Sequence, residues 1–241
     1  MNRLMRYPDP IAAAEACGGH ILSLLESTIV SGARASLAIS GGSSPRPMFE
    51  FFARTPFDWE SVHLFWVDER CVPPDNPQSN FKLANEVWLG PAKFPTQNIH
   101  RVRTELTPRE AALTYADELY KWFGRKYGEI PEFDVMHRGM GSDGHTASLF
   151  PGDTWIEDRR GLAANVWVEK MGQARVTLLP AVLEAARNSA MLVTGDDKIQ
   201  ALHAVLCGPR DHMKYPAQIA ADKATWFVDE AAAALLPIEI S

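Results

Sequence analysis

The chain alternates short apolar runs with longer helical patterns, and this alternation constrains the fold more than any other feature. The strand-like runs are 35–40, 61–67, 133–137, 164–170, 190–195 and 224–229. The helix-like runs are 10–31, 45–54, 79–89, 108–127, 180–187, 196–207 and 229–236. Nearly continuous apolar strands separated by helices are typical of a parallel sheet covered on both faces. We therefore predict an α/β fold with a mostly parallel, Rossmann-like sheet, and we expect 1–241 to form a single domain.

Composition excludes several classes of partner. The net charge is −6, whereas a general nucleic-acid binder usually has a basic face, so we expect no nucleic acid. No apolar run approaches the roughly eighteen residues of a membrane span, so we expect no membrane association. The three cysteines, Cys17, Cys71 and Cys207, are scattered and form no CxxC, which argues against a disulfide framework and a zinc cluster. A cytoplasmic protein without a metal is the expectation.

In an open parallel sheet, ligands bind beyond the carboxyl ends of the strands. After the first such run comes "SGGSSP" (40–45), in which Gly41, Gly42 and Ser43 precede a predicted helix. We expect Ser44 to cap that helix and Pro45 to occupy its first position. The glycines would let the backbone approach a ligand, and free N–H groups at a helix start favour an anion such as phosphate. Taken alone, the stretch suits an ordinary strand-to-helix turn equally well.

Charged residues follow the second run directly. Asp68, Glu69 and Arg70 continue from an apolar stretch that reads as a buried strand. An arginine at the carboxyl end of a central strand can bind a phosphate through two parallel hydrogen bonds. The alternative is a solvated strand end. Ser79 and Asn80 then begin the next helical pattern, either as a simple cap or as a wall of a binding site.

A lysine stands where it opposes a helix dipole. Lys198 lies in the first turn of the helix predicted after Gly195, although cations are unfavourable at helix N-termini. Local rules tend to be broken at functional sites, and a bound phosphate would resolve this conflict. The alternative is that Asp196 and Asp197 already compensate the dipole and that Lys198 is solvated.

The most informative stretch is "GMGSDGHTASLFPG" (139–152). It places Asp143 and His145 among glycines, at what we expect to be a strand-to-helix turn on the ligand edge of the sheet. A purely structural turn needs only a glycine or two. Histidine ordinarily titrates near neutrality and can take a proton from water. The alternative is a structural histidine.

Several catalytic schemes lack their motifs. Ser142 and Ser43 each miss one glycine of GxSxG, so a serine hydrolase of the nucleophile-elbow type is not expected. No HExxH supports a metal, and neither GxGxxG nor GxxxxGK[ST] supports a nucleotide.

Taken together, the loops resemble the 6-phosphogluconolactonase family, within the wider group that includes glucosamine-6-phosphate deaminase. The motifs that carry the resemblance are "SGGSSP" (40–45), "WVDER" (66–70), "SN" (79–80), "GMGSDGHTASLFPG" (139–152), "RVTLLPAVLEAA" (175–186), "TGDDK" (194–198) and "ATWFVDEAA" (224–232). The resemblance implies hydrolysis of 6-phospho-D-glucono-1,5-lactone to 6-phosphogluconate in the oxidative pentose phosphate pathway. It implies no cofactor, and its partner is a small phosphorylated sugar lactone.

The resemblance also implies residue roles. His145 matches the general base that activates water. Arg70 and Lys198 match the positions that hold the 6-phosphate, aided by the turn of Gly41, Gly42 and Ser43. Asp143 matches a polar position of the site.

Two further matches have less defined roles. Asp68 matches another polar position, and Arg175 matches an arginine of the pattern. The chain departs from the family at His137 and Arg138, where an apolar strand usually precedes "GMG". That pair could be a second cation beside the site, a buried ion pair or an exposed edge.

Two alternative functions are an isomerase or deaminase of the same fold and a non-catalytic sugar-phosphate sensor. An isomerase or deaminase of the same fold would carry a glutamate five residues after the histidine, where this chain has Phe150, and a tyrosine where it has Arg70. A non-catalytic sugar-phosphate sensor would normally be fused to a DNA-binding domain, for which we expect no room before a first helix near residue 10. We expect a monomer or a small homo-oligomer.

Overall fold

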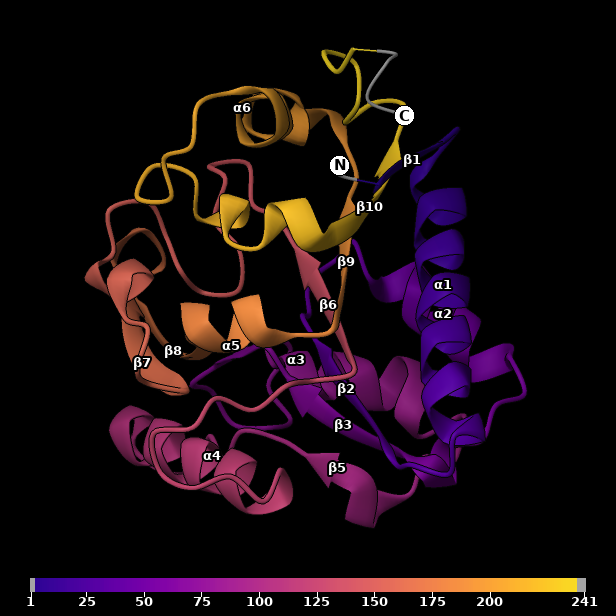
Figure 1. The fold of residues 1–241 in the computed structure, drawn as a ribbon, viewed down its shortest axis with the longest axis vertical. Coiled ribbons are helices and arrows are strands. Elements are labelled where there is room, and N and C mark those ends of the chain that lie inside the picture. Colours follow the sequence, from indigo (N-terminus) through magenta and orange to yellow (C-terminus); the bar gives the residue numbers. More distant parts are fainter. Residues whose placement is uncertain (1–2, 238–241) are drawn as a thin grey trace.

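A seven-stranded sheet in which every pairing is parallel runs through the centre of the computed structural model, which describes residues 3–237 (Figure 1). Its strand order is β1-β10-β9-β6-β2-β3-β5. The strands are β1 (Arg3–Tyr7), β2 (Ala35–Ile39), β3 (Val62–Trp66), β5 (Ile99–His100), β6 (Val135–Gly139), β9 (Asn188–Val193) and β10 (Ala224–Asp229). The predicted α/β fold with a mostly parallel sheet is confirmed.

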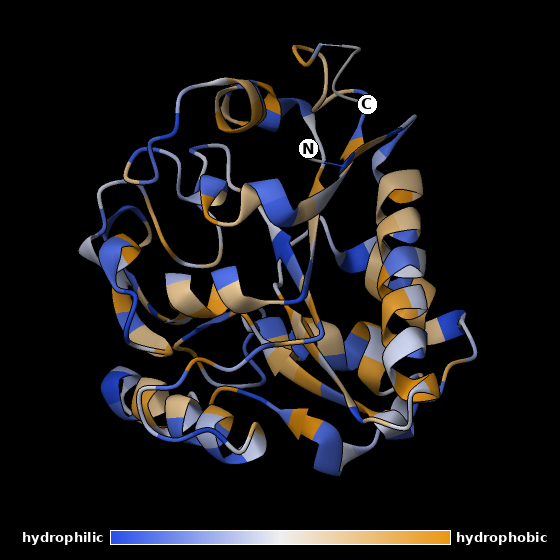
Figure 2. Ribbon diagram, viewed as in Figure 1, coloured by the Kyte–Doolittle hydropathy of each residue, from blue (hydrophilic) through white to orange (hydrophobic). Residues whose placement is uncertain are grey.

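Helices cover both faces of this sheet. They are α1 (Pro10–Val30), α2 (Arg46–Arg54), α3 (Asn80–Ala84), α4 (Pro108–Trp122), α5 (Pro180–Ala185) and α6 (Ile199–Cys207). Helices α1 and α2 share one apolar cluster with Leu37 and Leu64, whereas α4 and α5 share another with Ala38 and Phe65. In Figure 2 the strands of the parallel sheet are mostly orange or tan, because their apolar side chains form these clusters. Many of the connecting loops are blue or white.

A second, antiparallel sheet lies beside the first. It consists of β4 (Asp68–Arg70), β8 (Gln173–Leu178) and β7 (Ala163–Val168), in the order β4-β8-β7. The sequence prediction placed run 164–170 in the parallel sheet, and this is wrong. Buried and exposed residues alternate along β7, as expected for a strand with one face in solvent. The prediction also missed β8 and the short strands β1, β4 and β5.

One residue joins the two sheets. Val67, between β3 and β4, donates its N–H to the carbonyl of Ile39 in β2 at 2.8 Å. Its own carbonyl accepts from the N–H of Leu178 in β8, also at 2.8 Å. The chain thus passes from one sheet to the other without a loop between them.

Two predicted helix starts differ in the structure. Helix α2 begins at Arg46, with Pro45 at the N-cap and no capping side chain. Ser44 cannot cap it, because Pro47 has no N–H and the N–H of Arg46 donates to the carbonyl of Ser43 at 3.2 Å. No helix follows residues 139–152 directly. The chain forms turns there, and the next helical element is a 3₁₀ turn at Thr154–Glu157.

The C-terminal helix predicted over 229–236 is also absent. That segment forms successive turns, which begin where the carboxylate of Asp229 accepts from the N–H of Ala232 at 3.0 Å. Its backbone hydrogen bonds mostly span three residues, as from the N–H of Leu236 to the carbonyl of Ala233 at 2.9 Å, and Pro237 disfavours a helical conformation of the residue before it.

The order of the strands creates a crevice between β2 and β6. From β2 the chain proceeds to β3 and β5 on one side, whereas from β6 it proceeds to β9 and β10 on the other. The loops after β2 and β6 therefore diverge, and such a switch point is where open α/β sheets bind ligands.

Candidate active site

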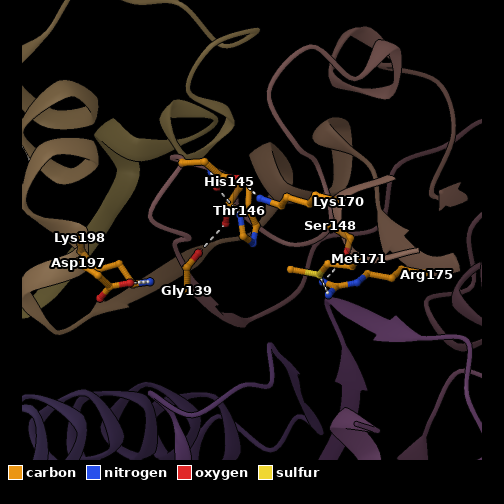
Figure 3. Close-up of polar contacts among 10 residues, drawn as sticks. Gly139, His145, Thr146, Ser148, Lys170, Met171, Arg175, Asp197 and Lys198 are labelled. Atoms are coloured by element: carbon orange, nitrogen blue, oxygen red, sulfur yellow. Dashed lines mark hydrogen bonds and ion pairs between the residues drawn. The ribbon is translucent and has the colours of Figure 1, made fainter. Parts of the chain in front are cut away.

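A cleft of about 390 Å³ lies at this switch point. Loops from the carboxyl ends of β2, β3, β6 and β9 line it, together with β8. The residues that the sequence predicted for the site and that line the cleft are Gly41, Gly42, Ser43, Asp68, Arg70, His145, Arg175 and Lys198. Figure 3 shows His145 between Lys198 on one side and Arg175 on the other.

Asp143 lies behind His145 and not in the cleft wall. Its Oδ1 is 2.5 Å from Nδ1 of His145 and also accepts the backbone N–H of that residue at 3.2 Å. Its Oδ2 pairs with the ammonium group of Lys170. Burial raises the pKa of Asp143, but the hydrogen bonds from His145 and Lys170 outweigh burial and hold the pKa well below its ordinary value.

An ionised Asp143 fixes the tautomer of His145. Because a carboxylate can only accept, Nδ1 of His145 carries the proton and Nε2 is left as the acceptor. Nε2 has no hydrogen-bond partner within residues 3–237, and the ring packs against Phe150 with its centroid 4.2 Å away. Thr146 anchors the loop by donating to the carbonyl of Gly139 at 2.9 Å (Figure 3). In this arrangement Nε2 is the nitrogen of His145 that can accept a proton from water.

Gly141 leaves the space in which this pair is held. A Cβ atom at that position would overlap with Nδ1 of His145 and would lie 2.8 Å from Oδ1 of Asp143. We expect Gly141→Ala to displace the imidazole and to lower kcat about 10²-fold, since a misplacement of about 1 Å can have that effect. The measurement is steady-state kinetics, and Gly19→Ala in α1, where a Cβ meets nothing within 4 Å, is the control. Equal kcat for Gly141→Ala and wild type would contradict the packing argument.

Two arginines face one another across the small sheet. Arg70 in β4 lies directly opposite Arg175 in β8, and both line the cleft. Like charges in this position destabilise a sheet. Neither guanidinium forms a salt bridge with any residue of the described range. An anion bound between them would remove the repulsion.

Arg175 is buried with weak partners. Its side chain donates to Oγ of Ser148 at 3.3 Å and to the sulfur of Met171 at 2.8 Å, while Nε has no partner among the described residues (Figure 3). Burial lowers its pKa, an effect that Asp68 partly offsets. A buried guanidinium ordinarily has better acceptors, so the site is suited to an anionic ligand.

The two acidic residues of "WVDER" have different roles. Asp68 lines the cleft, and its Oδ2 accepts from Oγ of Ser148 at 2.7 Å. Glu69 points into the fold, where its carboxylate accepts the N–H groups of Asn80 at 2.8 Å and Phe81 at 2.7 Å. Burial raises the pKa of Glu69, and these hydrogen bonds oppose the rise. Glu69 therefore fixes the start of α3 against β4.

The remaining cation comes from the other side of the cleft. Lys198 occupies the N-cap of α6 and pairs with Asp197 at 2.7 Å. Its side chain is only 17% exposed and lines the cleft, so it is not simply solvated.

The glycine turn after β2 also lines the cleft, and Gly42 in it has a φ of +109°. A Cβ at Gly41 would overlap with Asn80, so glycine is needed there.

Sequence reasoning missed several residues of the site. Ser40 and Met171 line the cleft, Ser148 joins Asp68 to Arg175, and Lys170 holds Asp143. Asn80 both begins α3 and forms a wall, so the two alternatives weighed for it hold together. Ser148 lies within the motif 139–152, so the sequence offered a signal for it. No motif includes Lys170, so the sequence offered no signal for that residue.

The described residues contain neither a candidate metal cluster nor a candidate membrane-spanning helix. Within residues 3–237, no three His, Cys, Asp or Glu side chains are grouped so that they could hold a metal ion. In the same range, no helix is both long and apolar enough to cross a membrane.

The chain is an α/β protein with a histidine–aspartate pair and several cations at the switch point of a parallel sheet, and comparisons with known proteins place it in a family. The family model described as glucosamine-6-phosphate isomerases/6-phosphogluconolactonase matches residues 8–228. A 6-phosphogluconolactonase of a Nostoc species is 36% identical over 96% of this chain and 97% of its own length. One from Haemophilus influenzae is 34% identical over 83% of this chain and 87% of its own.

The solved structures agree. The crystal structure of a 6-phosphogluconolactonase from Thermotoga maritima superposes with a TM-score of 0.82, at 28% identity, over 95% of this chain and all of that one. The chain belongs to the glucosamine-6-phosphate isomerase/6-phosphogluconolactonase family.

Proposed function

We propose that this chain hydrolyses 6-phospho-D-glucono-1,5-lactone to 6-phospho-D-gluconate, in the oxidative branch of the pentose phosphate pathway. The observation that carries the proposal is the sharing of one cleft by His145, held by Asp143, and the opposed pair Arg70 and Arg175. The first group suits the activation of water, and the second suits a phosphate. The names of the relatives support the same activity.

His145 supplies the proton transfers. In the proposed reaction, its Nε2 takes a proton from a water molecule, whose oxygen attacks the lactone carbonyl and forms a tetrahedral oxyanion. The bond between the carbonyl carbon and the ring oxygen then breaks, and the imidazolium returns its proton to that oxygen. The product is an open-chain acid. Asp143 keeps the imidazole oriented and stabilises its charge while it holds the proton.

The cations bind the other end of the substrate. Arg70 and Lys198 hold the phosphate with the turn of Gly41, Gly42 and Ser43. Arg175 adds charge from β8, and Asp68 orients that charge through Ser148. The cations come from both sheets, so the phosphate is held from two sides of the cleft.

The alternatives have less support. In the isomerase or deaminase pattern a glutamate would occupy the position of Phe150, whose ring packs on His145 and cannot transfer a proton. A sensor would need phosphate binding alone and would not require the hydrogen bond between His145 and Asp143. We further propose that 1–241 acts as a single domain in the cytoplasm, as a monomer or small homo-oligomer, without a cofactor.

Unphosphorylated gluconolactone should be a poor substrate. A phosphate contributes charge-assisted hydrogen bonds of about 1.5–3 kcal/mol each, so its removal should lower kcat/KM by at least about one to two decades. The measurement is base consumption at constant pH with freshly made lactone, compared with a blank without enzyme because the lactone also hydrolyses spontaneously. Equal use of both lactones would refute the phosphate assignment, and no rate above the blank with either would refute the activity.

A further inference from the structure

Strand β6 ends in two polar residues that face opposite ways. Because side chains alternate along a strand, His137 and Arg138 point to opposite faces of the parallel sheet. Arg138 lies on the face of α4–α6, where it donates to Oγ of Ser189 at 3.3 Å and to the carbonyl of Ile219 at 2.9 Å. His137 lies on the other face and lines the cleft, as its neighbour Leu192 does. Only one of the pair therefore lines the cleft.

His137 is buried without a partner. Its side chain is 1% exposed, and neither ring nitrogen forms a hydrogen bond with any residue of the described range. Oγ of Ser40 and Oδ1 of Asn80, which line the same cleft, are also buried and unpartnered among those residues. Buried polar atoms are nearly always paired in proteins, and leaving them unpaired destabilises the fold. Their grouping around one cleft indicates that a ligand supplies the partners.

We propose that His137 is a substrate-binding residue whose imidazole forms a hydrogen bond with an oxygen atom of the sugar phosphate in the cleft. The proposal rests on the proposed function and deepens it. Backbone contacts set the position of the ring, since the carbonyl of His137 accepts the N–H of Ser40 at 3.2 Å, just before the Gly41–Gly42 turn. The ring is thus fixed beside the turn that approaches the ligand.

The charge state of His137 suits hydrogen bonding to a ligand and does not suit the removal of a proton from water. Burial lowers its pKa to about 3, and the neighbouring charge of Arg138 acts in the same direction. The imidazole is therefore neutral at physiological pH and adds no cation to a cleft that already contains Arg70, Arg175 and Lys198. A group with so low a pKa is a weak base, so the proton transfers remain with His145.

The test is the variant His137→Leu, which fills similar space but cannot form hydrogen bonds. We expect the Kd for 6-phosphogluconate, measured by titration calorimetry, and the KM for the lactone both to rise about tenfold or more. We expect kcat to change by less than about threefold. The Tm should equal that of wild type or lie up to about 4 °C above it, since the substitution removes an unpaired buried group.

Polar replacements separate a hydrogen bond from packing. The amides of His137→Asn and His137→Gln reach toward the positions of Nδ1 and Nε2, and at least one of them should recover most of the lost affinity. The control is His20→Leu, the same substitution in a half-buried histidine of α1 that packs on Phe227, and it should leave Kd unchanged.

Three results would overturn the proposal. The first is an unchanged Kd and KM in His137→Leu, and the second is a weakened affinity that neither amide recovers. The third is a loss confined to kcat, which would make His137 part of the chemical step. Failure of the proposed function can be told apart from failure of the His137 proposal. If the proposed function is wrong, the wild-type protein itself hydrolyses no lactone above the blank.

Discussion

Replacing His145 by alanine should lower kcat for lactone hydrolysis by about 10²–10⁴-fold, the range that a positioned general base contributes. The fold should persist, because the residue lies on a loop and its ring packs mainly on Phe150. The measurement is kcat at saturating substrate, corrected for the spontaneous reaction.

Two further measurements make this result decisive. Calorimetry should show that His145→Ala still binds 6-phosphogluconate, because the cations of the cleft remain in place. His203→Ala, in the exposed part of α6, is the matched control and should retain full activity. A folded, ligand-binding His145→Ala protein with a near-normal rate would remove His145 as the base.

Loss of either cation that we propose for phosphate binding should chiefly weaken the capture of substrate. Arg70→Ala and Lys198→Ala each remove a charge-assisted hydrogen bond of about 1.5–3 kcal/mol. We expect kcat/KM to fall by about one to two decades in each variant, with the loss mostly in KM. Lys121→Ala, an exposed lysine of α4 far from the cleft lining, is the control.

Activity of the same variants toward the unphosphorylated lactone separates phosphate binding from other roles. Since that lactone carries no phosphate, Arg70→Ala and Lys198→Ala should process it at nearly the wild-type rate. An equal loss with both lactones would show that the two residues support the fold or the chemistry, and the phosphate assignment would then be wrong.

The parts of the site that are local in sequence could be predicted. Asp143 and His145 are two residues apart on one glycine-rich turn, so their contact follows from the chain itself. Glycine at 41 and 42 likewise pointed to a turn that approaches a ligand. The parallel sheet was predictable because β2, β3, β9 and β10 are apolar along most of their length.

Features that depend on distant pairing could not be predicted. Arg70 and Arg175 face each other only because β4 pairs with β8, and β4 is three charged residues long. Lys170 reaches Asp143 from a 3₁₀ turn after β7, with no sequence signal. The helix predicted over 229–236 is wrong because its alanines favour a helix, whereas the side chain of Asp229 and the ring of Pro237 at its two ends favour turns.

Val67 has a consequence for which substrates fit. It bonds through its N–H to the parallel sheet, whose strands β9 and β6 lead into the loops of Lys198 and His145. Through its carbonyl it bonds to the antiparallel sheet, which carries Arg175. Main-chain hydrogen bonds therefore link the strand of Arg175 to the sheet whose loops carry His145 and Lys198. We expect the cleft to favour sugar-phosphate lactones in which a set number of carbons separates the phosphate from the carbonyl, with little rearrangement on binding.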